Sequence, residues 1–393
     1  MINALQAKPA LMLLDGARWL NKPTYWLLAV VLLLLIIACV IGQALKRQPE
    51  SHVDHALLRR FNLRVRAWWM IFAILIAGFL LGSTWTVVLF GVVSFWALRE
   101  FITMTPTRRG DHRALFWVFF VLTPLQYVLV GIGRAFVEPQ DPVTAWLANL
   151  LGLTGVDSYG LYSIMIPVYA SLFIPARIAF SGDHKRFLER TAKIQAGLLI
   201  CVYALSYAPA LLQLELQTYK PPTTIAQIEL GEDMTIPPES QEILAPVKTK
   251  KRLWVEGSLA GLLFYFILVV QLGDLFQYVW GKMLGRRAIA PEINASRTWE
   301  GFLGGTATTT LVGSLLWWVT PFRIWEAALM AMITAIMGFA GGMTLSAIKR
   351  DRGVRDTGTL VQGHAGLLDQ IDSMCFSAPV FFHLTRFFFS SNV

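Results

Sequence analysis

Two aspartates near the end of the chain, Asp369 and Asp372, are three residues apart. In a helix this spacing puts both carboxylates on one face, where they could hold a hard cation such as magnesium together with substrate phosphates. A third acid, Asp274, stands inside an otherwise apolar segment. A carboxylate at the centre of a membrane helix costs about 2.5 to 3.5 kcal/mol, so this residue is a functional candidate unless it reaches water at the interface.

The segment just upstream of the aspartate pair is basic and ends on another acid: Lys349, Arg350, Arg352, Arg355 and Asp356. Cations and carboxylates at one membrane surface suit phosphoryl or nucleotidyl transfer, because cations offset phosphate charge while carboxylates hold the metal. The basic residues and the aspartate pair could also have roles that involve no catalysis. Arg352 above all could anchor the chain to anionic headgroups, and an isolated aspartate pair is more often a solvated helix face.

The spacing of these residues resembles that of the phosphatidate cytidylyltransferases, also called CDP-diacylglycerol synthases. Their pattern S-x-x-K-R-x4-K-D, followed by H-G-G-x-x-D-R-x-D, is matched at Ser346, Lys349, Arg350, Asp356, His364, Gly366, Asp369 and Asp372. The G-K, A-P and K-T-W-E-G elements of the family are similar to residues 281–282, 290–291 and 297–301. The resemblance covers residues 270–373.

The resemblance implies a multi-helix membrane enzyme that uses CTP and magnesium to convert phosphatidic acid into CDP-diacylglycerol and pyrophosphate. The catalytic residues that it implies are Lys349, Arg350, Asp356, His364, Asp369 and Asp372. Those for substrate binding are Lys282, Arg297, Ser346 and Arg355. Magnesium, with a second metal ion as an option, would be held by Asp274, Asp356, Asp369 and Asp372. For His364, orienting the substrate and capping the loop both remain open.

The chain also departs from the family pattern. Arg297 and Arg355 replace lysines, Ala365 replaces the middle glycine, and Gln370 replaces the arginine between the last two aspartates. Arginine keeps the charge of lysine but presents a planar fork instead of a point charge. The change at Gln370 removes a cation from between two carboxylates. These departures indicate a divergent paralogue branch, for which the lipid acceptor stays open.

Membrane helices must position these residues, because 55% of the chain is hydrophobic, 15% is charged and the mean hydropathy is +0.54. Apolar residues fall in continuous blocks near the roughly 20 residues that a helix needs to cross a bilayer, and the lack of alternation disfavours a barrel. We predict an all-α polytopic membrane protein with about ten transmembrane helices: Tyr25–Leu45, Ala67–Ser83, Thr86–Leu98, Ala114–Ile132, Tyr159–Ile178, Ile194–Leu214, Trp254–Trp280, Phe302–Val319, Trp325–Ile348 and Met374–Ser390.

The basic residues behind the net charge of +9 are distributed unequally between the two faces of the membrane. If successive loops lie on alternate faces, 23 of the 34 Lys and Arg residues fall on the same face. Cytoplasmic loops carry an excess of Lys and Arg, so this face is predicted to be cytoplasmic and both termini lie on the other. We expect the active site to face the cytoplasm from a bacterial inner membrane. The expected partners are CTP, a lipid phosphate and membrane lipids, and no nucleic acid.

A polar segment with five prolines, residues 215–253, is predicted to be an extramembrane loop, because such proline density breaks a long helix. It separates an N-terminal transmembrane region, 1–214, from a C-terminal transmembrane catalytic region, 254–393. The N-terminal region is interpreted as a scaffold, in which Glu100 could reach a site from a helix end. Cys39, Cys201 and Cys375 lie far apart in apolar segments and predict packing rather than a disulfide or a zinc site.

The predicted function is CTP-dependent cytidylyl transfer to a phospholipid phosphate. The alternatives are a catalytically altered paralogue that binds lipid or acts on another lipid phosphate, a CTP-dependent polyprenol kinase, and a lipid transporter. The kinase would release CDP instead of pyrophosphate. A transporter places its ionisable residues at the midplane within repeats, whereas these residues gather at one surface. The two helix-rich halves are compatible with a homodimer.

Overall fold

The computed structural model describes residues 22–46, most of 65–79, 82–105, 107–132, 158–214, 216–218, 252–253, 259–354 and 366–390. Each of the ten predicted segments contains helix in its described residues. In this part of the chain, strands are confined to an antiparallel pair of two residues each, β1 (Gln217–Thr218) and β2 (Arg252–Leu253). The all-α prediction is confirmed.

Long apolar helices dominate the molecule. Six helical stretches in the described residues are long and apolar enough to cross a membrane: Ser83–Met104, His112–Gly131, Tyr159–Ala179, Phe187–Gln213, Leu259–Leu284 and Ile324–Asp351. A further helix, α2 (Lys22–Lys46), is apolar over Lys22–Ile37. The chain is therefore a polytopic integral membrane protein, and the total of about ten spanning helices stays a prediction.

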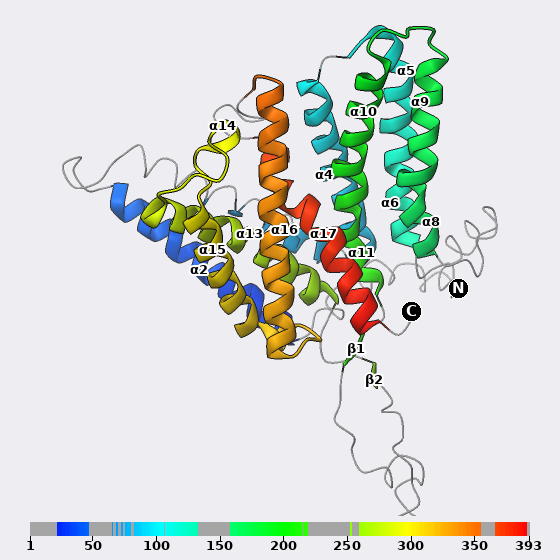
Figure 1. The fold of residues 1–393 in the computed structure, drawn as a ribbon. Coiled ribbons are helices and arrows are strands. Elements are labelled where there is room, and N and C mark those ends of the chain that lie inside the picture. The colour runs from blue at the N-terminus through cyan, green and yellow to red at the C-terminus, as the bar shows by residue number, and fades with distance from the viewer. Residues whose placement is uncertain are drawn as a thin grey trace, which may run out of the picture.

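The N-terminal region contains α4 and three interrupted helices (Figure 1). After α2 and the segment 65–79, its elements are α4 (Ser83–Met104), η1 (Arg109–Asp111), α5 (His112–Trp117), η2 (Val118–Leu122), α6 (Thr123–Ile132), α8 (Ser158–Ile164), η3 (Met165–Ala170), α9 (Ser171–Ala179), α10 (Phe187–Gly197), η4 (Leu198–Ala204), α11 (Leu205–Ala210) and η5 (Leu211–Gln213). Elements η2, η3 and η4 are π-helical turns inside the longer helices. The predicted short helix Thr86–Leu98 is too short, because α4 continues to Met104.

The C-terminal region is a bundle of four longer helices with short elements between them. Its elements are α13 (Leu259–Leu284), α14 (Pro291–Asn294), α15 (Trp299–Leu315), η7 (Trp317–Val319), α16 (Ile324–Asp351) and α17 (Leu368–Phe389). Close packing of α13 on α15 depends on glycine: a Cβ at Gly301 would lie 2.7 Å from the carbonyl oxygen of Gln277, and one at Gly305 would lie 2.5 Å from its Cα. Both glycines therefore serve helix packing.

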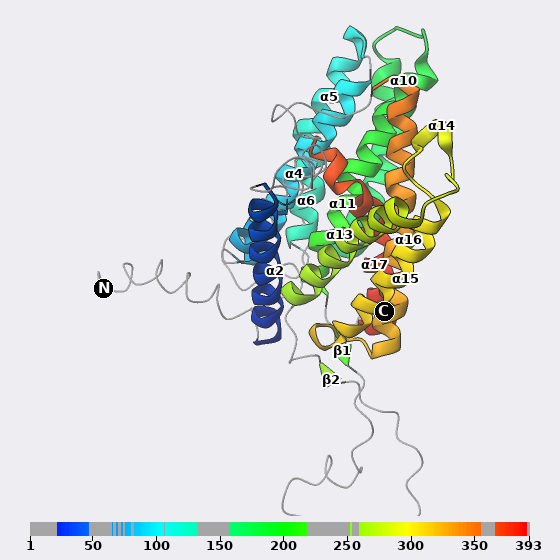
Figure 2. The same ribbon diagram turned by 90° about the vertical axis from the view of Figure 1, so that its left-hand side faces the viewer.

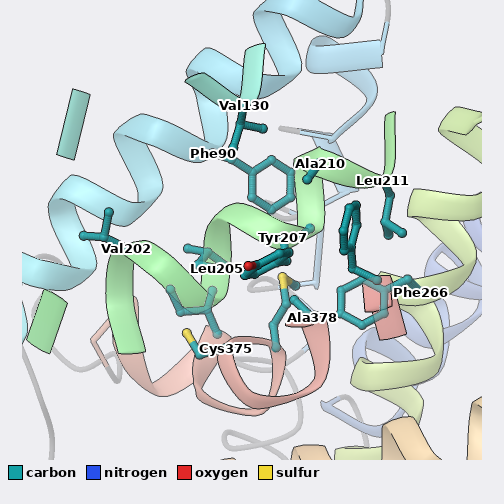
Figure 3. Packing of buried hydrophobic residues seen from close by; sticks show 14 of the residues in the cluster. Phe90, Val130, Val202, Leu205, Tyr207, Ala210, Leu211, Phe266, Cys375 and Ala378 are labelled. Atoms are coloured by element: carbon teal, nitrogen blue, oxygen red, sulfur yellow. The ribbon is translucent and has the colours of Figure 1, made fainter. Parts of the chain in front are cut away.

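The two regions share one hydrophobic core. Figure 3 shows Tyr207 and Leu211 of the N-terminal region beside Phe266 of α13 and Ala378 of α17. The ring of Tyr207 is fully buried, and its centroid lies 5.1 Å from that of Phe382 in α17. Helix α17 thus packs against both regions, which places its N-terminal end within reach of residues from either half of the chain.

Several of the basic loops meet on one face of the molecule. Arg190 at the start of α10 forms a buried ion pair with Asp111 beside α5, and Arg352 at the end of α16 lies 3.7 Å from Glu189 of α10. Figure 1 shows α14 and the corresponding ends of α5, α10 and α16 at the same end of the structure. The predicted gathering on one face is confirmed for these loops, whereas the predicted basic loop 46–66 lies largely outside the described residues.

Candidate active site

The aspartate pair lies in the first two turns of α17, which begins at Leu368. The predicted start of this helix at Met374 is therefore too late by six residues. Carboxylates near a helix N-terminus are stabilised by its exposed N–H groups and dipole, so the helix extends over both aspartates. The condition under which their spacing puts both carboxylates on one face is therefore met.

Asp274 of α13 pairs with Arg297, which comes from the loop before α15. Arg297 Nη2 lies 3.1 Å from Asp274 Oδ1, and Arg297 Nη1 donates to Gln277 Oε1 at 3.0 Å. The guanidinium also stands over the ring of Phe339 in α16, 5.6 Å from its centroid. The planar fork of arginine makes these contacts at the same time, so the charge of Asp274 is offset inside the bundle.

The loop that presents Arg297 is closed on itself by hydrogen bonds. Ile289 donates its backbone N–H to the carbonyl of Arg297 at 3.0 Å, and the hydroxyl of Thr298 caps α15. Glu300 Oε2 accepts the backbone N–H of Arg286 at 3.1 Å. The N–H of Glu300 itself and that of Arg286 hold the pKa of this carboxyl below its ordinary value. Arg297 is thus held two residues before the start of α15, next to the N-cap residue Thr298.

A second ion pair joins α16 to α17. Lys349 Nζ lies 2.8 Å from Asp369 Oδ1, and the two side chains are 15% and 10% exposed. Lys349 belongs to the last turn of α16, where a cation interacts favourably with the C-terminal end of the helix dipole. The basic segment and the aspartate pair, which the sequence places some 20 residues apart, are therefore in direct contact.

Asp372 lies between these two ion pairs. A Cβ at Gly342 of α16 would be 3.2 Å from Arg297 Nη2 and 3.6 Å from Asp372 Oδ2, so both side chains approach the same glycine. The charges of Asp274, Arg297 and Asp369 all act on the Asp372 carboxyl. Three carboxylates and two cations thus form one cluster where α13, α16 and α17 meet.

The predicted metal site is only partly visible. Among the described residues, no group of three or more His, Cys, Asp or Glu side chains could hold a metal ion. Asp274 and Asp369 instead face cations, and Asp356 lies outside the described residues. The donors are nevertheless all carboxylate oxygens, and magnesium is typically bound by one or two carboxylates with waters and substrate phosphates. The donor chemistry fits magnesium, which stays a prediction.

The other predicted site residues in the described part of the chain are Ser346, Arg350 and Lys282. Ser346 accepts a hydrogen bond from Asn294 Nδ2 at 3.2 Å, and Arg350 Nε donates to the carbonyl of Ile293 at 3.0 Å. Both residues therefore tie α16 to α14. Lys282 is exposed in the last turn of α13. Arg355, Asp356 and His364 lie outside the described residues.

Glu100 of α4 connects the N-terminal region to the site. It is 4% exposed, and its two carboxylate oxygens accept the backbone N–H groups of Leu367 at 3.1 Å and Leu368 at 2.8 Å. These N–H groups belong to the first turn of α17, where intrahelical acceptors are lacking. Glu100 therefore caps the helix that carries Asp369 and Asp372. An acid at the end of an apolar helix was its only sequence signal.

Gln370, which stands where the family has arginine, makes a different contact. Its backbone carbonyl accepts a hydrogen bond from Gln271 Nε2 of α13 at 3.3 Å. Its side-chain Oε1 is buried with no hydrogen-bond donor among the described residues. The segment between the two aspartates is thus anchored to α13 through its backbone.

The chain is similar to known proteins over most of its length. Residues 62–388 match the model of the family described as the cytidylyltransferase family. The uncharacterized protein YnbB of Escherichia coli strain K12 is 31% identical over 366 residues, which cover 92% of this chain and 97% of that protein.

Phosphatidate cytidylyltransferases match over a shorter stretch. That of a Synechocystis species is 39% identical over 112 residues, which cover 28% of this chain and 38% of that protein. That of Staphylococcus haemolyticus is 35% identical over 120 residues, which cover 30% of this chain and 46% of that protein. The matched stretches therefore span less than half the length of these two relatives.

Proposed function

Because the chain belongs to the cytidylyltransferase family and is a nucleotidyltransferase-like membrane enzyme, we propose that it transfers the cytidylyl group of CTP to the phosphate of a membrane lipid. The proposed acceptor is phosphatidic acid, and the proposed products are CDP-diacylglycerol and pyrophosphate. A full-length match to an uncharacterized relative, beside partial matches to phosphatidate cytidylyltransferases, fits a divergent branch of the family.

One observation carries this proposal: carboxylates and cations gather in a single cluster at the junction of α13, α16 and α17. Asp274, Asp369 and Asp372 lie within the electrostatic reach of Arg297 or Lys349. A triphosphate and a lipid phosphate both bring negative charge, which fixed cations offset and a carboxylate-bound metal neutralises. Positioning and electrostatics of this kind supply most of the acceleration in phosphoryl-type transfer.

In the proposed reaction an oxygen of the lipid phosphate attacks the α-phosphorus of CTP. The bond from that phosphorus to the bridging oxygen breaks, and pyrophosphate leaves with the electron pair. A phosphate monoester is largely ionised at neutral pH, so no strong general base is required. Lys349 and Arg297 would neutralise phosphate oxygens. Magnesium, when bound by the carboxylates of the cluster together with Asp356, would supply further positive charge at the triphosphate.

We place the site on the cytoplasmic face of a bacterial inner membrane in this proposal. The basic loops that gather on the face of α14 support this orientation, because cytoplasmic loops are enriched in Lys and Arg. CTP would then enter from water, while the lipid acceptor would enter from the bilayer.

The test is product analysis with purified protein in detergent, CTP, magnesium and phosphatidic acid. We expect pyrophosphate and CDP-diacylglycerol in equal amounts, and loss of both with Asp369→Asn. The matched control is Asp351→Asn, because Asp351 lies at the end of α16, is 65% exposed and pairs with Arg352 instead of the cluster. Release of CDP in place of pyrophosphate would identify a kinase and overturn the proposal. Absence of turnover despite bound CTP and lipid would also overturn it.

A further inference from the structure

An apolar cavity of about 280 Å³ lies between α2, the segment 65–79, α13 and α15. Leu27, Leu34 and Leu35 of α2 form one wall, and Phe72 faces them from the second element. The opposite wall runs along α13 from Phe264 to Leu272, which is about 12 Å at the helical rise per residue. The cavity is therefore elongated along α13, and hydrocarbon side chains form nearly all of its lining.

Among the described residues of the lining, Gln271 carries a polar side-chain amide, and it stands at the end of the cavity nearest the charged cluster. Its Nε2 donates to the carbonyl of Gln370, the residue between Asp369 and Asp372. Asp274 follows three positions later on α13, less than one turn of helix away. One end of the cavity thus adjoins the proposed transfer site, and the rest extends away from it between apolar walls.

We propose that this cavity holds one acyl chain of the lipid acceptor while its phosphate lies at the carboxylate and cation cluster. The inference rests on the proposed function and specifies how the substrate is held. A hydrocarbon chain suits an elongated, apolar space, because it carries no polar group that would lack a partner there, whereas a peptide would bury unsatisfied backbone polar groups. Gln271 lies where the acyl chain of the lipid would end and its phosphate would begin.

Helix α2 forms one wall of this cavity. It lies beside α13 (Figure 2) and precedes residue 62, where the family match begins. The wall that it adds therefore comes from outside the part of the chain that matches the family model. Selectivity for the acyl chain of the lipid would then depend on this protein's N-terminal segment as well as on its C-terminal site.

A binding experiment tests the cavity independently of turnover. Phosphatidic acid with a diazirine in one acyl chain is added to the full-length protein in detergent, irradiated, and the labelled peptides are identified by mass spectrometry. We expect labels on α2 and α13 within the cavity lining, and competition by unlabelled dioleoyl phosphatidic acid. Labels spread over the outer lipid-facing surfaces, without saturation or competition, would overturn the inference even if turnover is found.

Two matched pairs of variants test its effect on catalysis. Leu34→Trp and Val312→Trp introduce bulk into the cavity, whereas Leu33→Trp and Leu311→Trp change neighbouring residues outside its lining. Leu33 and Leu34 are 57% and 58% exposed, so the two substitutions differ in their position relative to the cavity and not in exposure.

We expect the two cavity variants to lower kcat/KM for dioleoyl phosphatidic acid by about tenfold, as when extra bulk is forced into a space that another group must fill, and to leave dihexanoyl phosphatidic acid nearly unaffected. The control variants should resemble the unsubstituted protein with both lipids. Equal losses with long and short chains, or no difference between cavity and control variants, would overturn the inference. Failure of the proposed function is distinguishable, because it would abolish turnover of every acceptor in the unsubstituted protein.

Discussion

The N-terminal and C-terminal regions each contain an acid within an apolar helix, but they neutralise it in different ways. Asp274 of α13 meets the guanidinium of Arg297 at 3.1 Å. Glu100 of α4 meets two backbone N–H groups at the start of α17. The first acid belongs to a cluster of side-chain charges that a phosphate or a metal ion can rearrange. The second is fully engaged with the backbone, which leaves it no free role in chemistry.

This difference separates residues that carry charge at the site from residues that position it. An ionisable residue within a membrane helix is a functional candidate by default, yet the partner determines what kind of function follows. A side-chain ion pair can exchange its partner for a substrate. A carboxylate that accepts two backbone N–H bonds holds a helix in place. The N-terminal region therefore contributes to the site through geometry.

After Asp369→Asn, the largest effect should follow from Asp372→Asn, which removes one charge of the C-terminal cluster and keeps the side-chain shape. We expect kcat/KM for lipid cytidylylation to fall by about 100-fold or more, as when one electrostatic contact to a transition state is lost. Steady-state kinetics and circular dichroism would measure activity and folding. Glu292→Gln on the exposed face of α14 is the control. Undiminished turnover would remove Asp372 from the site.

A smaller loss is expected for Glu100→Gln, which keeps one acceptor oxygen but removes the charge from the cap of α17. Turnover should fall by about tenfold, the scale seen when an outer-shell partner of a metal ligand is changed, and the magnesium concentration for half-maximal rate should rise. A titration of rate against magnesium measures both effects. Restoration by Glu100→Asp is expected to be partial, because the shorter side chain reaches only one of the two N–H groups.

A matched cap at the other end of the bundle separates positioning from general stability. Glu326 accepts the backbone N–H of Arg323 at 2.7 Å and caps the start of α16. Glu326→Gln should lower thermal stability without changing the magnesium requirement. Equal behaviour of the Glu100 and Glu326 variants would contradict the assignment of Glu100 as a positioning residue.

Arg297→Lys tests how much the planar fork adds to the C-terminal cluster. Lysine keeps the charge opposite Asp274 but cannot hold Asp274 and Gln277 together. We expect kcat/KM to fall by about fivefold, equivalent to the loss of about one hydrogen bond. Arg297→Gln, which also removes the charge, should lose more. If the two variants are indistinguishable in turnover, the charge of Arg297 has no part in the reaction.

The smallest effect on turnover is expected for Asp111→Asn in the N-terminal region. This change breaks a buried ion pair whose side chains are 2% and 4% exposed. Arg190 keeps its ion pair with Asp183 at 3.1 Å but loses its buried charged partner, which should destabilise the fold by about 1 to 3 kcal/mol, while turnover per folded molecule stays the same. Thermal unfolding in detergent and active-site titration measure the two quantities. Lost turnover at unchanged stability would show that the N-terminal network acts on the site directly.

Local patterns predicted the helices well because the length of an apolar run and the requirement for internal backbone hydrogen bonds determine them. The predicted helix boundaries were wrong where charged residues belong to the helix. The predicted helix began at Met374, yet Asp369 and Asp372 lie in the first turns of α17, because an N-terminus tolerates acids and Glu100 supplies its cap. The pairing of Lys349 with Asp369 follows the predicted mixture of signs, although no pattern specified which cation meets which acid.

The sequence by itself determined the all-α membrane class, the face on which the basic loops gather, and the residues of the charged cluster, because composition, run length and motif spacing are local properties. Only the tertiary structure decided that Glu100 caps a helix 267 positions away, that Arg297 spans Asp274 and Gln277, and that α2 closes an apolar cavity beside α13. Those contacts join distant segments, and their existence depends on how the helices pack rather than on any single helix.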